Sequence, residues 1–167
     1  MKKKGVITVF LTLMLSVLSM FILMAARGIR VYIMRSEAEY AVDNAVRSCF
    51  AEYNRELFDS FNILLIDSSY KEYEGGIDRI EDHFSTYLYE SLTVNELCDV
   101  SVEAGPGDKP DFCGDDADDG YLTEYMRENG SPGFDIDNCY SSLIFTATFT
   151  NPLTGPYSVT REYAYGM

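Results

Sequence analysis

Residues 2–32 read KKKGVITVFLTLMLSVLSMFILMAARGIRVY, a lysine cluster and a glycine followed by a long apolar run. Residues 6–26 contain no charged side chain. As a helix they would extend about 32 Å, which matches the hydrocarbon core of a bilayer. The apolar core of a secretory signal peptide is shorter, at about 7–15 residues. The run therefore predicts a retained transmembrane helix rather than a cleaved signal peptide.

Basic side chains flank the apolar run on both sides. Lysines at 2–4 precede it, and Arg27, Arg30 and Arg35 follow it, so charge alone leaves the orientation open. The remainder of the chain is acidic, contains most of the 13 tyrosines and carries all four cysteines, which is typical of an exported domain. We expect a single-pass protein of the cell membrane, with a cytoplasmic N-terminus and an extracellular C-terminal domain.

The helix is expected to continue beyond the membrane. No proline precedes Pro106, and no glycine occurs between Gly28 and Gly75. Apolar side chains recur beyond residue 30 at spacings of three and four, which indicates one face of a helix. Alanines on this face would permit close packing by a neighbouring element. The predicted packing stripe consists of Val31, Met34, Ala38, Ala41, Ala45, Cys49 and Tyr53.

Charge spacing supports the same helix. Asp43 with Arg47 and Glu52 with Arg55 have the separation of stabilising helical ion pairs. The alternative is a membrane anchor followed by a separate amphipathic helix, with the break at Gly28. In either case, close packing is expected on the outer half.

The rest of the sequence predicts a small α+β domain with an antiparallel sheet and one or two further helices. Strands are expected at 61–66 and 97–104, helices at 76–92 and 121–129, and a terminal hairpin at 141–149 and 157–165. The fold class is therefore α+β, with a long N-terminal membrane-spanning helix continuing into this domain. The expected segments are a basic cytoplasmic leader at 1–5, a transmembrane helix at 6–26, an extracellular continuation of the helix at 27–58 and the domain at 59–167.

Composition excludes several functions. The net charge of −14 argues against binding of nucleic acid, which requires clustered basic side chains. No phosphate-binding loop, nucleophile elbow or zinc-protease motif is present. The single histidine, His83, is interpreted as a surface residue of a helix. We therefore expect no catalysis, no cofactor and no small-molecule substrate.

The acidic stretch DDADDG at residues 115–120 resembles part of an EF-hand loop, but positions 3 and 12 lack a ligand. A looser calcium site would draw on Asp115, Asp119, Asp135 and Asp137. The alternative is a solvated loop whose carboxylates cap the helix that follows.

Four cysteines allow two disulfides in an exported domain, with three connectivities. Cys98 and Cys113 enclose a short loop-like stretch and are the first candidates for a bridge. The alternative is a set of reduced, partly buried thiols.

Residues 2–70 resemble the start of TadE/TadG-like minor pilin proteins of Gram-positive tight-adherence (Flp-type) pilus systems. The resemblance lies in GVITVF at the opening of the apolar run, in the basic residues beyond it, and in AEYNRELFDSFNILLID at 51–67. It implies a helix that anchors the subunit in the lipid bilayer and packs with other pilin or pseudopilin subunits. It also implies contact with the pilus assembly machinery and a role in cell adhesion.

The resemblance implies Gly5 as the position after which a pilin leader would be cut. Val6 would then be the first residue and Phe10 the fifth, where pilins usually carry a glutamate. This departure favours an assembly component that stays in the membrane. The expected function is a non-catalytic pseudopilin-like minor subunit or assembly component. The alternative is a membrane-anchored extracellular binding module, which calcium would stabilise.

Overall fold

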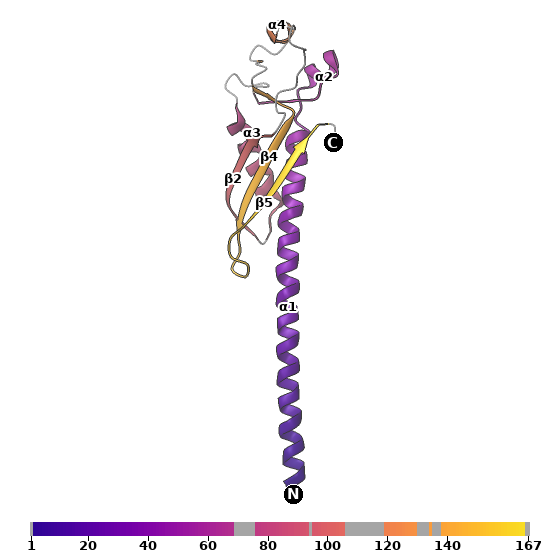
Figure 1. The fold of residues 1–167 in the computed structure, drawn as a ribbon, viewed down its shortest axis with the longest axis vertical. Coiled ribbons are helices and arrows are strands. Elements are labelled where there is room, and N and C mark those ends of the chain that lie inside the picture. The colour runs from indigo at the N-terminus through magenta and orange to yellow at the C-terminus, as the bar shows by residue number, and fades with distance from the viewer. Residues whose placement is uncertain are drawn as a thin grey trace. The chain divides into compact units, whose positions relative to one another are not determined.

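The structure is a computed structural model that shows an α+β protein, as the sequence predicts (Figure 1). The chain divides into two compact units, residues 1–37 and residues 38–167, and each is described by itself. The described residues are 2–68, 76–93, 95–105, 119–129, 134 and 138–165.

Helix α1 (Lys2–Phe50) provides the whole of the first unit. Its apolar side chains are exposed on every side; Ile7 and Phe21, for example, are 64% and 66% exposed. An 18-residue window of this helix has a mean hydropathy of 2.5, and none of it is buried. The Thr12 hydroxyl donates to the carbonyl oxygen of Val9 at 2.9 Å, so a polar group is satisfied inside the helix. The helix is long and apolar enough to cross a membrane.

The second unit contains a three-stranded antiparallel sheet in the order β2-β4-β5, formed by β2 (Glu96–Ala104), β4 (Ser142–Thr150) and β5 (Tyr157–Ala164). Figure 1 shows the three strands side by side. Phe145 of β4 lies opposite Val102 of β2 and Arg161 of β5. The predicted terminal hairpin and the predicted strand at 97–104 are confirmed.

One face of the sheet forms the main core. Side chains of β4 alternate between buried and half-exposed, as expected for a strand with one covered face. Helix α3 (Ile77–Ser91), predicted at 76–92, contributes Phe84 to the same core. The ring of Phe145 lies 6.0 Å from that of Phe50 and 5.0 Å from that of Phe84, measured between centroids, in both cases edge to face. Phe145 therefore joins α1, α3 and the sheet.

The last three turns of α1 pack into this core. Four residues of the predicted packing stripe are buried there, and each is at most 3% exposed: Ala38, Ala41, Ala45 and Cys49. Small side chains on this face of the helix fit against the larger residues of the same core. The chain's own core, formed with residues of the sheet and of α3, therefore covers them. Val31 and Met34 belong to the first unit, and Tyr53 lies beyond the end of the helix.

Helix α1 ends at Phe50, earlier than the expected boundary at residue 58. The backbone N–H of Asn54 donates to the carbonyl oxygen of Leu65 at 3.0 Å, so it is unavailable to a continuing helix. The hydroxyl of Tyr165 donates to the carbonyl oxygen of Phe50 at 2.6 Å. This bond satisfies one of the carbonyl groups that a helix end leaves unpaired. Contacts from distant parts of the chain therefore decide where the helix stops.

The predicted strand at 61–66 is largely wrong. Helix α2 (Arg55–Phe61) occupies its start, and only β1 (Ile66–Asp67) is extended and paired, with β3 (Cys139–Tyr140). Asn62 ends α2 in the left-handed conformation at φ 57°, which asparagine tolerates better than most residues. Of the apolar residues that suggested a strand, Phe61, Ile63 and Leu65 contribute to a second core cluster, whereas Ile66 belongs to the main core.

That second cluster lies under α2 and α4 (Asp119–Glu128), the short helix predicted at 121–129. Arg127 donates through Nε to the carbonyl oxygen of Phe134 at 2.9 Å, which connects Phe134 to α4. The buried members are Leu57, Leu65, Met126, Phe134 and Cys139.

The predicted ion pairs along α1 are replaced by others. Asp43 accepts a hydrogen bond from Arg161 of β5 at 2.7 Å, and Arg55 pairs with Asp59 at 3.7 Å within α2. The Arg161 pair connects the helix to the edge strand of the sheet.

Replacing Phe145 with alanine is expected to destabilise the second unit by about 3–5 kcal/mol, because a large side chain with no exposed surface leaves a cavity between three elements. The free energy of unfolding is measured by urea titration of the full chain in detergent micelles, followed by near-ultraviolet circular dichroism.

The matched control is Thr146→Ala on the opposite face of the same strand, where the hydroxyl meets that of Thr160 at 3.1 Å. Its expected cost is below about 1 kcal/mol. Equal losses of unfolding free energy in Phe145→Ala and Thr146→Ala would show that Phe145 does not organise the core.

Candidate functional site

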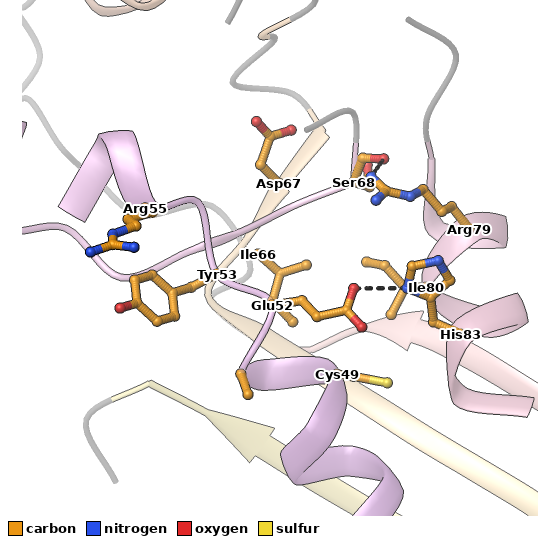
Figure 2. Close-up of a pocket in the computed structure, with 11 residues that line it drawn as sticks. Cys49, Glu52, Tyr53, Arg55, Ile66, Asp67, Ser68, Arg79, Ile80 and His83 are labelled. Atoms are coloured by element: carbon orange, nitrogen blue, oxygen red, sulfur yellow. Dashed lines mark hydrogen bonds and ion pairs between the residues drawn. The ribbon is translucent and has the colours of Figure 1, made fainter. Parts of the chain in front are cut away.

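A cavity of about 390 Å³ opens in the second unit, within the range of small-molecule sites (Figure 2). Its walls come from the end of α1, the turn that follows, the start of α2, β1 and one face of α3. Among the charged and polar groups at the wall are Glu52, Asp67, Ser68, Arg79 and His83. The basic side chains of the lining are Arg55, Arg79 and His83, and the acidic ones are Glu52 and Asp67.

Asn54, which is completely buried, positions the start of α2 and Asp67 beside the cavity. Its Oδ1 accepts hydrogen bonds from the backbone N–H groups of Glu56 and Leu57 at 3.0 and 3.1 Å, which caps α2. Its Nδ2 donates to Oδ2 of Asp67 at 2.8 Å. One side chain thus fixes the start of a helix and the position of a buried carboxylate.

Ser68 lines the cavity and is also buried. Its hydroxyl and its backbone N–H both donate to the carbonyl oxygen of Asn138, at 3.0 and 3.1 Å. Its own carbonyl oxygen accepts from Nη1 of Arg79 at 2.9 Å. The guanidinium of Arg79 is therefore held at the wall by the backbone that follows β1.

Glu52, in the turn after α1, connects two residues of α3. Nδ1 of His83 donates to its Oε2 at 2.8 Å, and the hydroxyl of Tyr87 donates to its Oε1. The His83 and Glu52 side chains are 38% and 36% exposed. Figure 2 shows the carboxylate of Glu52 turned toward the imidazole. Both oxygens of this carboxylate are therefore bonded within the protein.

Two neighbouring groups keep their protons. The hydrogen bond to Glu52 raises the pKa of Tyr87 from its ordinary value of 10 to about 12. Burial raises the pKa of the Cys49 thiol to about 12, and the charge of Glu52 adds to the shift. A thiol with this pKa is not a nucleophile near neutral pH.

The hydroxyl of Ser68 is not paired with a general base, because it donates to a backbone carbonyl. The described part of the chain pairs no serine or cysteine with His83.

The calcium candidates fall mostly outside the described residues: Asp115, Asp135 and Asp137 are not among them, and of Asp119 only the backbone, at the start of α4, is described. Within the residues that are described, no group of three or more histidine, cysteine or acidic side chains could hold a metal ion.

The cysteines divide by burial. Cys49 and Cys139 are buried, whereas Cys98 is exposed where β2 shifts its register against β4. Cys113, the predicted partner of Cys98, lies outside the described residues. Gly5, the predicted cleavage position, lies within α1.

The sequence did not reveal the cluster formed by Glu52, His83 and Tyr87. Glu52 was assigned to an ion pair with Arg55, and His83 was interpreted as a surface residue. The available signal was the spacing of Arg79, His83 and Tyr87, which places three polar side chains on one face of an amphipathic helix. No pattern in the sequence indicated that Glu52 would meet them.

No protein-family model, no curated protein and no solved structure matches the chain.

Asn54→Ala is expected to cost about 2–4 kcal/mol of stability, since it removes a helix cap and leaves the buried Asp67 carboxylate without its amide donor. Chemical denaturation of the full chain measures the loss.

The comparison variant is Asn54→Asp, which retains the capping oxygen but loses the donor to Asp67. We expect it to be destabilised at neutral pH, where two carboxylates face each other, and to recover in acid as one of them is protonated. A stability of Asn54→Asp that does not change with pH would contradict the assignment of the Nδ2 bond.

Tyr87→Phe tests the phenol–carboxylate bond. Because the pKa of Tyr87 is raised in the folded protein, the bond stabilises the fold fully below pH 10 and is lost as the pH rises from 10 to about 12. The stability of the wild type should therefore fall more steeply over that interval than the stability of Tyr87→Phe. The control is Tyr89→Phe, an exposed position of the same helix, which should follow the wild type. Parallel curves for all three proteins would count against the bond.

Proposed function

We propose that the protein is a single-pass membrane protein with a cytoplasmic N-terminus and an extracellular second unit. Its function would be that of a non-catalytic, pseudopilin-like minor subunit or assembly component of a tight-adherence pilus. The observation that carries this proposal is the exposed apolar part of α1, taken together with the resemblance of residues 2–70 to the start of TadE/TadG-like proteins.

The first unit supports membrane insertion on physical grounds. A helix that is apolar on all sides is stable only inside a protein core or a membrane. In α1 these side chains have no protein cover within the described residues. Transfer of each large one out of water is worth about 1.5–3 kcal/mol. Basic side chains flank the run on both sides, so the cytoplasmic N-terminus is proposed from the acidic, tyrosine-rich and cysteine-bearing remainder, which is typical of an exported domain.

Contact with other subunits requires a surface other than the alanine stripe, because Ala38, Ala41 and Ala45 are buried in the chain's own core. Ile29, Tyr32 and Ile33 lie just beyond the apolar run and are 58–74% exposed. Their spacing of three and four places them on one side of the helix. We assign the contact with pilin or pseudopilin subunits to these residues.

The second unit supports a non-catalytic role. The thiol of Cys49 stays protonated, and no serine or cysteine of the described residues is paired with His83. The second unit has a buried aromatic core and the first unit is an apolar helix, and both features suit an anchored structural component.

Deletion of the gene is expected to abolish surface filaments and adhesion. The double variant Ile29→Ser/Ile33→Ser should remain in the membrane fraction but lose filament assembly, because the proposed contact surface is removed while the apolar run is intact. Filaments are sheared from the cells and quantified together with the membrane fraction.

Tyr89→Ser, at an exposed position of α3, is the matched control and should assemble filaments normally. Wild-type levels of filaments and adhesion in the deletion strain would refute the pilus role. Accessibility of the second unit to protease in intact cells tests the topology separately.

A further inference from the structure

We propose that both edges of the three-stranded sheet are closed to a further strand by charged side chains, Glu81 at β2 and Arg161 at β5. Removal of either side chain would turn its edge into a docking site for the same strand of a second copy of this chain. The inference concerns the second unit alone, so it does not depend on the pilus proposal.

Strands β2 and β5 are the edges of the sheet, since each pairs only with β4 among the described strands. Figure 1 shows them on either side of β4. An edge strand carries backbone N–H and C=O groups that a strand of another molecule can pair with. The two edges have nine and eight residues, and neither contains a proline that would interrupt such pairing. Protection of these edges must therefore come from other groups.

The carboxylate of Glu81 occupies the outer edge of β2. The backbone N–H of Gly105, just after the strand, donates to the carbonyl oxygen of Ser142 at 3.0 Å. Because residues of an antiparallel strand turn alternately toward and away from the neighbouring strand, Val102 has its N–H directed away from β4. That N–H donates instead to Oε2 of Glu81, on α3, at 3.2 Å. A helix side chain therefore fills one hydrogen-bonding position of this edge.

The guanidinium of Arg161 occupies the outer edge of β5 in a corresponding way. The backbone N–H of Tyr165, one residue past the strand, donates to the carbonyl oxygen of Ser141 at 3.1 Å. The same alternation directs the backbone groups of Thr160 away from β4. The carbonyl oxygen of Thr160 accepts a hydrogen bond from Nη1 of Arg161 at 3.1 Å. A carbonyl group that could accept from an incoming strand is therefore already paired.

Helix α1 holds Arg161 in this position. Nε of Arg161 donates to Oδ1 of Asp43 at 2.7 Å, and Nη2 lies 3.9 Å from Oε2 of Glu39. Asp43 and Glu39 are four residues apart, about one turn of the helix. The three nitrogen atoms of the guanidinium thus have three different partners, which fixes its orientation at the strand edge.

The two occupied positions lie in the same row of the sheet. Val102 of β2 is opposite Phe145 of β4, and Phe145 is opposite Arg161 of β5. A strand added at either edge would have to displace a charged side chain from the middle of the new ladder. The displaced group would lose its hydrogen bond to the backbone, and charged side chains on edge strands oppose strand addition in general.

A second copy of the chain is the partner that fits an opened edge. In a two-fold antiparallel pairing centred on Thr160, Thr160 meets its own copy and Glu162 lies opposite Ser158. A pairing of β2 centred on Val102 likewise brings no like charges together. Since like charges directly opposite each other destabilise a sheet, both edges are compatible with themselves once the charged side chain is absent.

The experiment compares Glu81→Ala with the wild type, both as the full chain in detergent micelles. Alanine is the strongest helix former, so α3 is expected to keep its structure. Analytical ultracentrifugation over a range of protein concentrations measures self-association, and any association through the first unit is common to both proteins. We expect Glu81→Ala to associate at least tenfold more strongly than the wild type. Hydrogen exchange of the Val102 amide should become slower as the concentration of this variant rises.

Asp82→Ala is the matched control, because it removes the same charge from the next, exposed residue of α3. It should associate as the wild type does. An increase in association of Asp82→Ala equal to that of Glu81→Ala would assign the effect to net charge and overturn the proposal.

Arg161→Thr tests the other edge. It should also associate at least tenfold more strongly than the wild type, although the loss of a positive charge makes the acidic chain repel itself more. Near-ultraviolet circular dichroism establishes that each variant is folded, and Glu81→Ala decides the case if Arg161→Thr is not, since Arg161 also pairs with Asp43. Wild-type association of the folded variants would refute the proposal.

Discussion

The second unit depends on the packing of Phe145 between Phe50 of α1 and Phe84 of α3. Each of the three rings belongs to a different element, so the contact sets the distance of both helices from the sheet. The alanines of α1 complete this arrangement, because larger side chains at those positions would hold the helix further away. The hydrophobic effect supplies the driving force, and the ring geometry gives the core a single arrangement.

The end of α1 follows from that packing. Once Phe50 is fixed against the sheet, Tyr165 reaches its carbonyl oxygen and Asn54 bonds with Leu65. The chain therefore leaves the helix at this point and turns Glu52 toward α3. The cavity exists because of this turn: its walls are the end of the helix, the start of the next one, and the face of α3 that carries Arg79 and His83.

The two units suit different environments. The first presents an apolar surface that favours a bilayer, whereas the second has its own core and an acidic exterior that favours water. This division supports the proposal of an anchored protein. The burial of the alanine stripe within the second unit also bears on that proposal, since any contact between subunits would have to use another part of the helix.

Much of the fold could be predicted from the sequence, because the spacing of apolar residues along the chain depends on the type of helix or strand that they form. The apolar run, the amphipathic α3 and the alternating strands of the terminal hairpin each show a period that matches one type of element. The strand expected at 61–66 failed because a short apolar run fits a strand and the edge of a helix equally well. The Asn54 cap at the start of α2 decides between them, and Asn54 is itself held by partners further along the chain, Asp67 and Leu65.

The sequence by itself determined an apolar N-terminal helix, an acidic α+β domain and a terminal hairpin, since each depends on neighbours a few residues apart. Only the tertiary structure decided where α1 ends, what covers its alanine stripe, and that Glu52 meets His83 and Tyr87 across more than 30 residues of chain. The physical reason is that a hydrogen bond or a packing contact depends on distance in space, and periodicity along the chain carries no information about which distant segments come together.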